Sequence, residues 1–518
     1  MVKSLSADRT DAPARLGADP RRGRVSSTNG FVAGASFLVC GLALAVSALA
    51  SGLDEWRDGP QLALCALVAT CVGVAHLVFF ELPRRLRTAT AFAAVASIFA
   101  VFVFTSTAVY LVTGTFDRFD DALFESAAGF TTTALSVLER PEDAARGIVL
   151  WRALTQWIGG FTALAVIVGL LPFLGVGGLE VSDITRSTRR VSFFSPRTRS
   201  LLSRLGLLYL ALTAAGIALF AVGGMGPFDA VTYALTTIST GGFENHAGSF
   251  AFFDSALIEW FAVGGMAMAG INIALVAAVL RGNVGPLRRS SELRVYGGIL
   301  VAGTLVVFLQ LVGEVSQPWS TTLRDAAFSV TSVVSTTGAS VTDWGGWPVG
   351  PQVVLLMFMG VGSMSGSTGS GFRIVRAMAL FGYVRRELVR QVQPHSVVAV
   401  KVGRAPLDEA LVSRLIGYQI LWVVVAGFAA IGVALFDVDL VSSLSVAISA
   451  LANVGPALGD VSPSAGATGL TAGARMVLVP VMLLGRLEIS PLIVGLLVLF
   501  RVPRRWPGAV RRAWIRRR

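Results

Sequence analysis

Long apolar segments without a charged residue are the feature that most restricts the possible folds of this chain. Residues 31–53, 88–116 and 153–179 contain no Asp, Glu, Lys or Arg. A helix of about 20 apolar residues crosses the hydrocarbon core of a bilayer. Only 14% of the 518 residues are charged, against about 25% in soluble domains, so a soluble or disordered chain is not expected. Ten transmembrane segments are predicted, near 31–51, 60–80, 90–113, 148–175, 199–224, 254–280, 294–313, 350–381, 412–436 and 473–501.

The basic residues follow membrane topology rather than forming a binding face. The net charge is +12, but the arginines gather in connections such as 186–204 and 385–404 and in the last residues, 501–518. The alternate connections are acidic. By the positive-inside rule, both termini are predicted to be cytoplasmic in a multi-pass protein of the lipid bilayer. This distribution argues against nucleic-acid binding, and the polar N-terminus, 1–30, has no apolar signal core.

Four shorter apolar segments follow the third, fifth, seventh and ninth predicted spans. They read DALFESAAGFTTTALSVL (121–138), DAVTYALTTISTGGF (229–243), DAAFSVTSVVSTTGAS (325–340) and SSLSVAISALANVGPALG (442–459). Each begins with a residue predicted to be the N-cap of a half-helix, namely Asp121, Asp229, Asp325 and Ser442. Thirteen residues after each cap stands a small residue, namely Ala134, Gly242, Gly338 and Gly455. This shared offset predicts a fourfold internal repeat.

The predicted fold is an all-α polytopic membrane protein. Four pseudo-symmetric repeats of helix, half-helix, filter loop and helix surround one pore, and two extra transmembrane helices precede them. The predicted division is an N-terminal cytoplasmic tail (1–30), the two extra helices (31–88), pore repeat 1 (89–184), repeat 2 (185–282), repeat 3 (283–404), repeat 4 (405–502) and a basic cytoplasmic tail (503–518).

The repeated loops suit a cation pore. A half-helix of ten residues rises about 15 Å and ends near the membrane centre. Its dipole places partial negative charge there, and four such ends favour a cation. A non-helical backbone is tolerated at that depth only where it lines a cavity or is buried in protein. Rings of carbonyl oxygens can then replace the hydration shell of an alkali cation.

The predicted ion-binding filter comprises Thr132, Thr133, Ala134, Thr240, Gly241, Gly242, Thr336, Thr337, Gly338, Asn453, Val454 and Gly455. The threonines can add hydroxyl oxygens to the carbonyl ring, and Asn453 takes the equivalent place in the fourth repeat. The simpler alternative is that Gly and Thr only make turns or close helix contacts, as small residues do in membranes. A single loop of this kind would favour the simpler alternative, but four loops in one register favour an ion filter.

At this point the residues resemble a known family. GFTTTALSVL, STGGF, STTGA and NVGPALG are similar to the four filter segments of the Trk/Ktr/HKT superfamily of cation transporters. QWIGGFTALAVIVGLLPFLGVGG (156–178), MLLGRLEI (482–489) and the two extra helices resemble its TrkH branch. The resemblance implies potassium uptake across the cell inner membrane, with potassium as the transported ligand and no bound cofactor. It also implies a homodimer and a cytoplasmic nucleotide-binding regulatory partner of the TrkA or KtrA type.

The resemblance also implies an intramembrane gate beneath the filter. In the family, the second helix of the third repeat is broken by a flexible loop, and here the matching stretch is GVGSMSGSTGSGFRIVR (360–376). So many Gly and Ser residues make a poor continuous helix. The predicted gate residues are Gly362, Ser363, Ser365, Gly366, Gly369, Gly371 and Arg486. A tight helix crossing is the alternative for the loop.

Arg486 lies within an apolar span, where a buried charge is costly and usually faces a cavity or a partner. The matching family arginine lies on the pore axis, which implies that Arg486 repels cations in the closed pore. A structural ion pair or a hydrogen bond to carbonyl oxygens is the alternative. Glu488, two residues on and about 200° around the helix, is not expected to be its direct partner.

Ala134 departs from the family pattern. The filter glycine of the first repeat falls at this position, and plant relatives that prefer sodium commonly carry serine there. A Cβ atom restricts the backbone and intrudes on one quarter of a ring. We therefore expect weaker discrimination of potassium from sodium, and a sodium-selective relative is an alternative.

Three further functions are alternatives. A symporter coupled to sodium or protons would carry ionisable residues at the midplane, and only Arg486 and Glu488 qualify. An enzyme is not expected, because the chain has no phosphate-binding loop, HExxH motif or His–carboxylate cluster. A non-conducting subunit is the third. The basic connections 185–204 and 385–404 are either docking surfaces for a regulatory partner or topology determinants alone.

Overall fold

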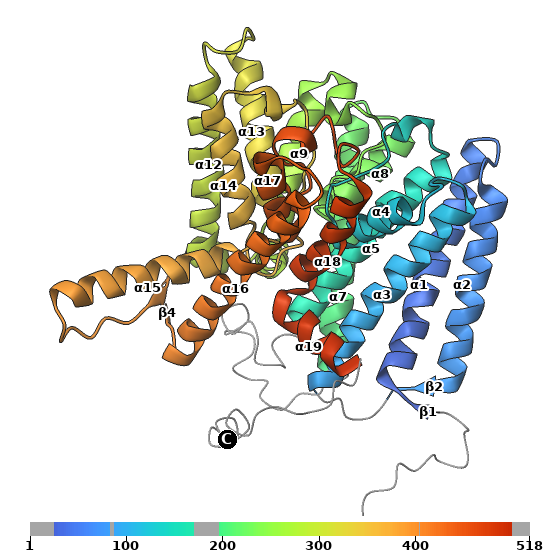
Figure 1. Cartoon of the computed structure of the whole chain (residues 1–518), viewed down its shortest axis with the longest axis horizontal. Helices are drawn as coiled ribbons and strands as arrows, with labels where there is room; N and C mark the ends of the chain where they lie inside the picture. The colour runs from blue at the N-terminus through green and yellow to red at the C-terminus, as the bar shows by residue number, and fades with distance from the viewer. Residues whose placement is uncertain (1–24, 83–87, 170–195, 404, 500–518) are drawn as a thin grey trace, which may run out of the picture.

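The computed structural model describes residues 25–82, 88–169, 196–403 and 405–499. It is almost entirely helical, with its long helices packed side by side in one bundle (Figure 1). The predictions for the terminal tails and for most of the basic connection 185–204 lie outside the described residues.

The first two long helices form a hairpin at one edge of the bundle. They are α1 (Thr28–Ala50) and α2 (Gly59–Phe79), which pack along their length and are joined through a 3-10 turn, Ser51–Leu53. Short strands β1 (Val25–Ser26) and β2 (Phe80–Glu81) pair in parallel at the base. The side chain of Ser27 accepts a hydrogen bond from Gly30 N–H and so caps α1.

The order of long helix, short helix and second helix then occurs four times. The first set is α3 (Thr88–Val112), α4 (Phe119–Thr131) and α5 (Arg146–Gly169). The second is α7 (Pro196–Val222), α8 (Pro227–Ile238) and the pair α9 (Ala256–Ala269) and α10 (Ile273–Leu280), followed by the short α11 (Gly285–Arg289). The third is α12 (Ser291–Leu311), α13 (Trp319–Ser335), α14 (Val349–Val361) and α15 (Ile374–Val392). The fourth is α16 (Glu409–Ala434), α17 (Leu440–Ala452), α18 (Ala472–Leu487) and α19 (Ile489–Leu499).

Strands β3 (Lys401–Val402) and β4 (Ala405–Pro406) form an antiparallel pair between the third and fourth sets. Single 3-10 turns lie in the connections after the short helices, at Pro141–Asp143, Ser249–Phe253, Trp344–Gly346 and Gly459–Val461. Helix α15 leaves the bundle sideways, at the lower left of Figure 1.

Several of the ten predicted segments are not single continuous helices. The break in the second helix of the third repeat was expected, whereas those in the second and fourth repeats were not. Among the described residues, six helices are long and apolar enough to cross a membrane, or seven if α9 and α10, bent by 105°, are one span. The segment 350–381 is broken between α14 and α15 by glycines with positive φ, and 473–501 is broken at Glu488, whose φ is +62°. The fourth segment, 148–175, is helical to Gly169 and then leaves the described residues. Hydropathy alone does not detect such breaks, because the apolar composition continues across them.

The four predicted N-caps are also wrong. The short helices begin earlier, after Arg118, Gly226, Pro318 and Asp439. Asp121 and Asp229 lie in the first turns, where their charge still favours the helix N-terminus. Asp325 lies well inside α13. Asp439 caps α17 by accepting hydrogen bonds from Val441 and Ser442 N–H.

Glycines allow the second helices to approach the ends of the short helices. A Cβ atom on Gly159 of α5 would collide with the carbonyl oxygen of Phe130, which lies at the end of α4. Gly485 of α18 meets the carbonyl oxygen of Leu451, at the end of α17, in the same way. Small residues permit this close packing in membrane helices. The short helices are thereby held with their C-terminal ends inside the bundle.

Candidate functional site: four converging loops above a buried Gly/Ser loop

Four residues in one register end the short helices in a left-handed conformation. Thr132, Thr240, Thr336 and Asn453 have φ of +54°, +54°, +62° and +55°. Two residues further on, Gly242, Gly338 and Gly455 are left-handed as well, with φ of +75°, +74° and +117°. Glycine is the residue that adopts this region without a steric cost. The corresponding Ala134 is not left-handed. The loops therefore share one backbone turn, and the first departs from it after Thr132.

The four loops meet one another. A Cβ atom on Gly242 would collide with the carbonyl oxygen of Thr337, and one on Gly338 with that of Val454. The loop of the first repeat closes the circle, since Ala134 N–H donates to Val454 O at 3.3 Å. The structure thus brings all twelve predicted filter residues together, and each lies in a buried or nearly buried position.

The Ala134 methyl group lies where the three glycines face one another. A Cβ atom built on Gly242, Gly338 or Gly455 would lie 2.8, 2.6 or 2.6 Å from the Ala134 Cβ. The single side chain of this ring therefore occupies its centre rather than its rim.

Several side-chain oxygens line the segment beneath the ring. Thr133 Oγ1 bonds to Thr131 Oγ1 at 2.9 Å, and Thr337 Oγ1 bonds to Ser335 Oγ at 2.7 Å. In the described part of the chain, Thr132 Oγ1 and Asn453 Oδ1 are buried without a hydrogen-bond partner. These two atoms belong to equivalent positions of the first and fourth repeats. Buried oxygens without a donor are the groups that a cation can satisfy.

The charge distribution of the backbone favours a cation at this point. The short helices α4, α8, α13 and α17 all end where the loops meet, so the partial negative charges of their C-termini converge. A cavity of about 300 Å³ opens where the loops leave the ring. It is lined by Ala134, Gly242, Gly338 and Pro456, and by Glu139 and Glu244 further out.

The predicted gate residues Gly362 to Gly371 form a loop between α14 and α15. Gly362, Gly366 and Gly371 have φ of +69°, +74° and +83°, which accounts for the broken helix. The alternative of a tight helix crossing does not describe the stretch, because it is not helical. Residues 362–370 are buried, although the stretch has no regular structure.

The loop touches the filter directly. Ser370 N–H donates to Thr336 Oγ1 at 2.9 Å. The hydroxyl of Thr368 donates to Ile238 O at the end of α8, at 3.1 Å, and a Cβ atom on Gly369 would lie 2.7 Å from Ser335 O. Bonds from Asn272 Nδ2 to Ser365 O and from Ser365 N–H to Glu292 hold its other side. The loop therefore lies beneath the filter and packs against the ends of its helices.

Arg486 binds this loop. Its Nη1 donates to Thr368 O at 3.0 Å and to Ser370 Oγ at 2.8 Å, and its side chain is buried. As expected, Glu488 is not its partner. Glu488 pairs with Arg376 at 2.7 Å and Arg373 at 3.3 Å, at the start of α15. Two nearby residues of the fourth repeat thus hold the C-terminal side of the loop and the start of α15.

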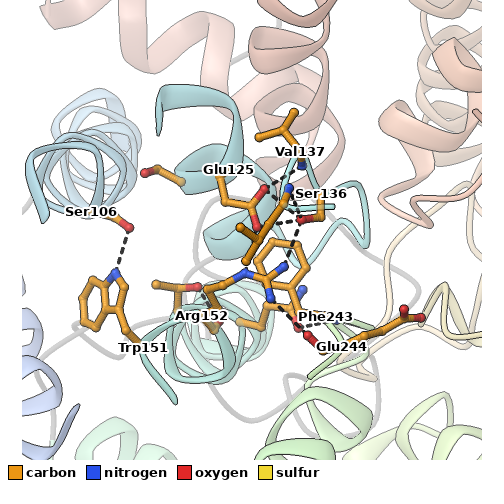
Figure 2. Close-up of polar contacts among 12 residues, drawn as sticks. Ser106, Glu125, Ser136, Val137, Trp151, Arg152, Phe243 and Glu244 are labelled. Atoms are coloured by element: carbon orange, nitrogen blue, oxygen red, sulfur yellow. Dashed lines mark hydrogen bonds and ion pairs between the residues drawn. The ribbon is translucent and has the colours of Figure 1, made fainter. Parts of the chain in front are cut away.

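Sequence reasoning missed three polar residues around the first two filter loops. Glu125 of α4 and Arg152 of α5 form a buried ion pair, with Oε1 and Nε 2.9 Å apart. Figure 2 shows the pair beside Ser136. Gln156, one turn after Arg152, binds the backbone of the second loop. The available signal was Glu125, a charged residue nine positions before Ala134, and the polar Arg152 and Gln156 four residues apart ahead of the glycine pair Gly159 and Gly160.

Known proteins share this architecture. The family model described as TrkH, a cation transport protein, matches residues 63–294 and 303–506. The Trk system potassium uptake protein TrkH of Vibrio parahaemolyticus is 32% identical over 381 residues, 72% of this chain and 78% of that protein. The corresponding protein TrkI of Halomonas elongata is 31% identical over 384 residues, 73% of this chain and 77% of that protein.

A solved structure of a TrkH protein also matches this chain. The crystal structure of the potassium transporter TrkH from Vibrio parahaemolyticus matches with a TM-score of 0.78 and 28% identity, covering 89% of this chain and 98% of that chain. This match confirms the predicted all-α multi-pass membrane fold. The predicted resemblance is confirmed as well, and the chain belongs to the TrkH family of cation transport proteins.

Proposed function

We propose that this protein mediates potassium uptake across the cell inner membrane through the ring of four loops. The observation that carries the proposal is the convergence of four short-helix C-termini on loops that share a left-handed position. The buried, unpartnered Oγ1 of Thr132 lies at that position and suits an alkali cation. The names of the relatives, all potassium uptake proteins, support the same ion.

Sodium permeation is the second candidate, and Ala134 favours it. A methyl group at the centre of the ring makes the ring asymmetric, with three glycines and one side chain. An asymmetric ring matches the size of one dehydrated cation less closely, so discrimination between potassium and sodium is weaker.

Flux through the purified protein in liposomes tests both candidates. Potassium, rubidium and sodium influx are measured separately under an imposed diffusion potential. We expect potassium and rubidium influx, with sodium influx closer to potassium than in a relative that carries glycine at this position. Absence of any cation flux, together with failure to rescue a potassium-uptake-deficient bacterium on low potassium, would contradict the proposal and leave a non-conducting subunit.

Conduction without coupling is favoured over symport by the partners of the buried carboxylates. Glu488 pairs with Arg373 and Arg376, and Glu125 pairs with Arg152. A carboxylate held by arginine is a poor carrier of protons or sodium. We expect potassium flux to follow the membrane potential with no dependence on a sodium or proton gradient. Flux that requires either gradient would favour the symporter.

The loop 362–371 is proposed to be the gate, with Arg486 as the residue that holds it closed. It contacts the filter through Thr336, and its glycines permit another conformation. Movement of the loop breaks the bonds from Arg486 to Thr368 and Ser370. A disulfide between cysteines introduced on the loop and on α18 is expected to lock the pore shut until reduced.

The protein is further proposed to work as a homodimer, with both termini cytoplasmic, and to be regulated by a cytoplasmic nucleotide-binding partner. The basic connections 185–204 and 385–404 are its proposed docking surfaces. Co-purification that weakens as salt rises would support this role, because exposed charge pairs are screened. Reporter fusions at both ends test the orientation.

A further inference from the structure

Helix α5 presents two polar side chains, one turn apart, to the loop of the following repeat. They are Gln156 and Arg152, and both are buried. Their partners are backbone atoms of residues 241–244, which flank Gly242 of the second loop. The first repeat therefore supplies side chains that hold the second repeat's quarter of the filter.

Gln156 binds this backbone with both ends of its amide group. Nε2 donates to Gly241 O at 2.8 Å, and Oε1 accepts from Phe243 N–H at 3.0 Å. The two bonds lie on either side of Gly242. Gly241 has room for no side chain, because a Cβ atom there would collide with Gln156 Oε1. One side chain thus fixes the peptide groups before and after the filter glycine.

The carbonyl group of Gly241 is held by a side chain from another repeat. The oxygen atoms of Thr337 and Val454 lie against Gly242 and Gly338, within the ring. The oxygen of Gly241 accepts its hydrogen bond from Gln156 of α5. The first repeat therefore fixes one carbonyl group of the second repeat's filter segment.

Arg152 secures the next residues of the same loop. Its Nη1 donates to Glu244 O at 3.0 Å, and its guanidinium lies 4.4 Å from the centre of the Phe243 ring. Its Nε pairs with Glu125 at 2.9 Å, and its Nη2 donates to Ser136 Oγ at 2.9 Å. Arg152 thus joins the outgoing segments of the first and second loops (Figure 2).

This arrangement occurs at one quarter of the ring. In the part of the chain that the structure describes, no hydrogen bond links a side chain of α9, α14 or α18 to a filter loop of the following repeat. The side chain Gln352 of α14 binds Gly345 O and Trp347 O, away from the filter.

We propose that Gln156 is a specificity-determining positioning residue of the pore, assisted by Arg152. Gln156 fixes the second loop, which lies beside Ala134. Ala134 belongs to the first loop, the one quarter of the ring that has no glycine. With its backbone held on both sides of Gly242, the loop does not relax to fit a smaller cation. The inference rests on the proposed cation conduction and adds the residue that limits which cation passes.

The test compares Gln156→Met, which keeps the side-chain size and removes both hydrogen bonds, with Gln352→Leu as a matched control. Gln352 also binds two backbone oxygens, but outside the filter. Potassium and sodium influx into liposomes are measured at equal amounts of folded protein. We expect the potassium-to-sodium ratio to fall about fivefold in Gln156→Met, which corresponds to one net hydrogen bond, and to stay unchanged in Gln352→Leu.

Two further variants keep the test decisive. Gly241→Ala disturbs the same contact from the other side, and Gln156→Asn is too short to reach both backbone atoms. Both are expected to lower the ratio, even if Gln156→Met does not fold. A ratio equal to wild type in all folded variants, with only total flux reduced, overturns the inference and leaves Gln156 a structural residue. A wild type that conducts no cation overturns the proposed function instead.

Discussion

The predicted filter loops and the proposed gate loop, residues 362–371, lie in contact, are both rich in glycine and are both buried, yet they are held in different ways. Each filter loop follows a short helix, and local bonds hold it in part, as where Ser449 Oγ bonds to both Gly455 N–H and Gly455 O. The second loop is also held by Gln156 of α5. The gate loop is fixed by side chains distant in sequence, namely Asn272, Glu292, Thr336 and Arg486.

These two kinds of support would make one part of the proposed pore rigid and the next part movable. Contacts within one turn re-form whenever the turn forms, so a filter loop keeps its shape if neighbouring helices shift. Contacts between distant helices break together when those helices separate. The gate loop is therefore expected to move first, and mutations in the two regions should fail differently.

The largest effect is expected from Gly338→Ala in the filter. The substitution places a Cβ atom against Val454 O in a backbone with φ of +74°. Left-handed strain of about 1–3 kcal/mol adds to this collision, so potassium flux should fall about a hundredfold. Gly360→Ala in α14, where nothing lies within 4 Å of the added Cβ, is the control and should retain flux. Equal losses of potassium flux in both variants would contradict the conclusion that the ring is close-packed.

Arg486→Met tests the contacts that hold the proposed gate loop. It removes both hydrogen bonds to the loop while leaving the ring untouched. Two charge-assisted bonds are worth about 1.5–3 kcal/mol each, so leak through the closed pore should rise at least about tenfold. The ion preference should not change. Arg475→Met, on the same helix but paired with Asp121, controls for loss of a positive charge. A leak equal to wild type would mean that Arg486 does not hold the gate.

Ala134→Gly is expected to change the preference between potassium and sodium rather than the leak through the closed pore. It removes the methyl group from the centre of the ring and restores four glycines. The potassium-to-sodium flux ratio should rise about threefold to tenfold, a difference near 1 kcal/mol. Influx of each ion into liposomes measures the ratio. Ala339→Gly is the control, because it removes a buried methyl group from the outgoing segment of the third loop, outside the ring. An unchanged ratio in Ala134→Gly would show that this methyl group does not limit discrimination.

The smallest effect is expected from Asp439→Ala at the cap of α17. The carboxylate accepts from Val441 and Ser442 N–H. Hydrogen bonding with the Ser442 side chain first, and then these backbone bonds, hold its pKa below the usual range. Loss of an N-cap costs about 1 kcal/mol, and Asp439→Asn should largely retain it. Thermal unfolding in detergent measures the difference. A changed ion ratio would show that the short helices transmit strain to the ring.

Much of the fold was predictable because it depends on composition and local order. Apolar runs predicted the long helices, and the offset of thirteen residues predicted which small residues meet. The caps were predicted wrongly, because the short helices extend over polar residues, such as those of the first turns of α13, that a hydropathy pattern assigns to the connection. The breaks in the second helices were only partly predicted. The Gly/Ser composition revealed the one after α14, whereas the bend between α9 and α10 and the break at Glu488 carry no comparable signal.

Hydropathy and spacing along one chain are enough to establish a multi-pass helical protein with four equivalent loops. Three contacts emerge from the folded structure alone. The Ala134 methyl lies at the centre of the ring, Arg486 binds the proposed gate loop, and Gln156 holds the second predicted filter segment. The physical reason is that each of these is a contact between segments far apart in sequence. A hydrogen bond between such atoms depends on helix packing, which no local pattern records.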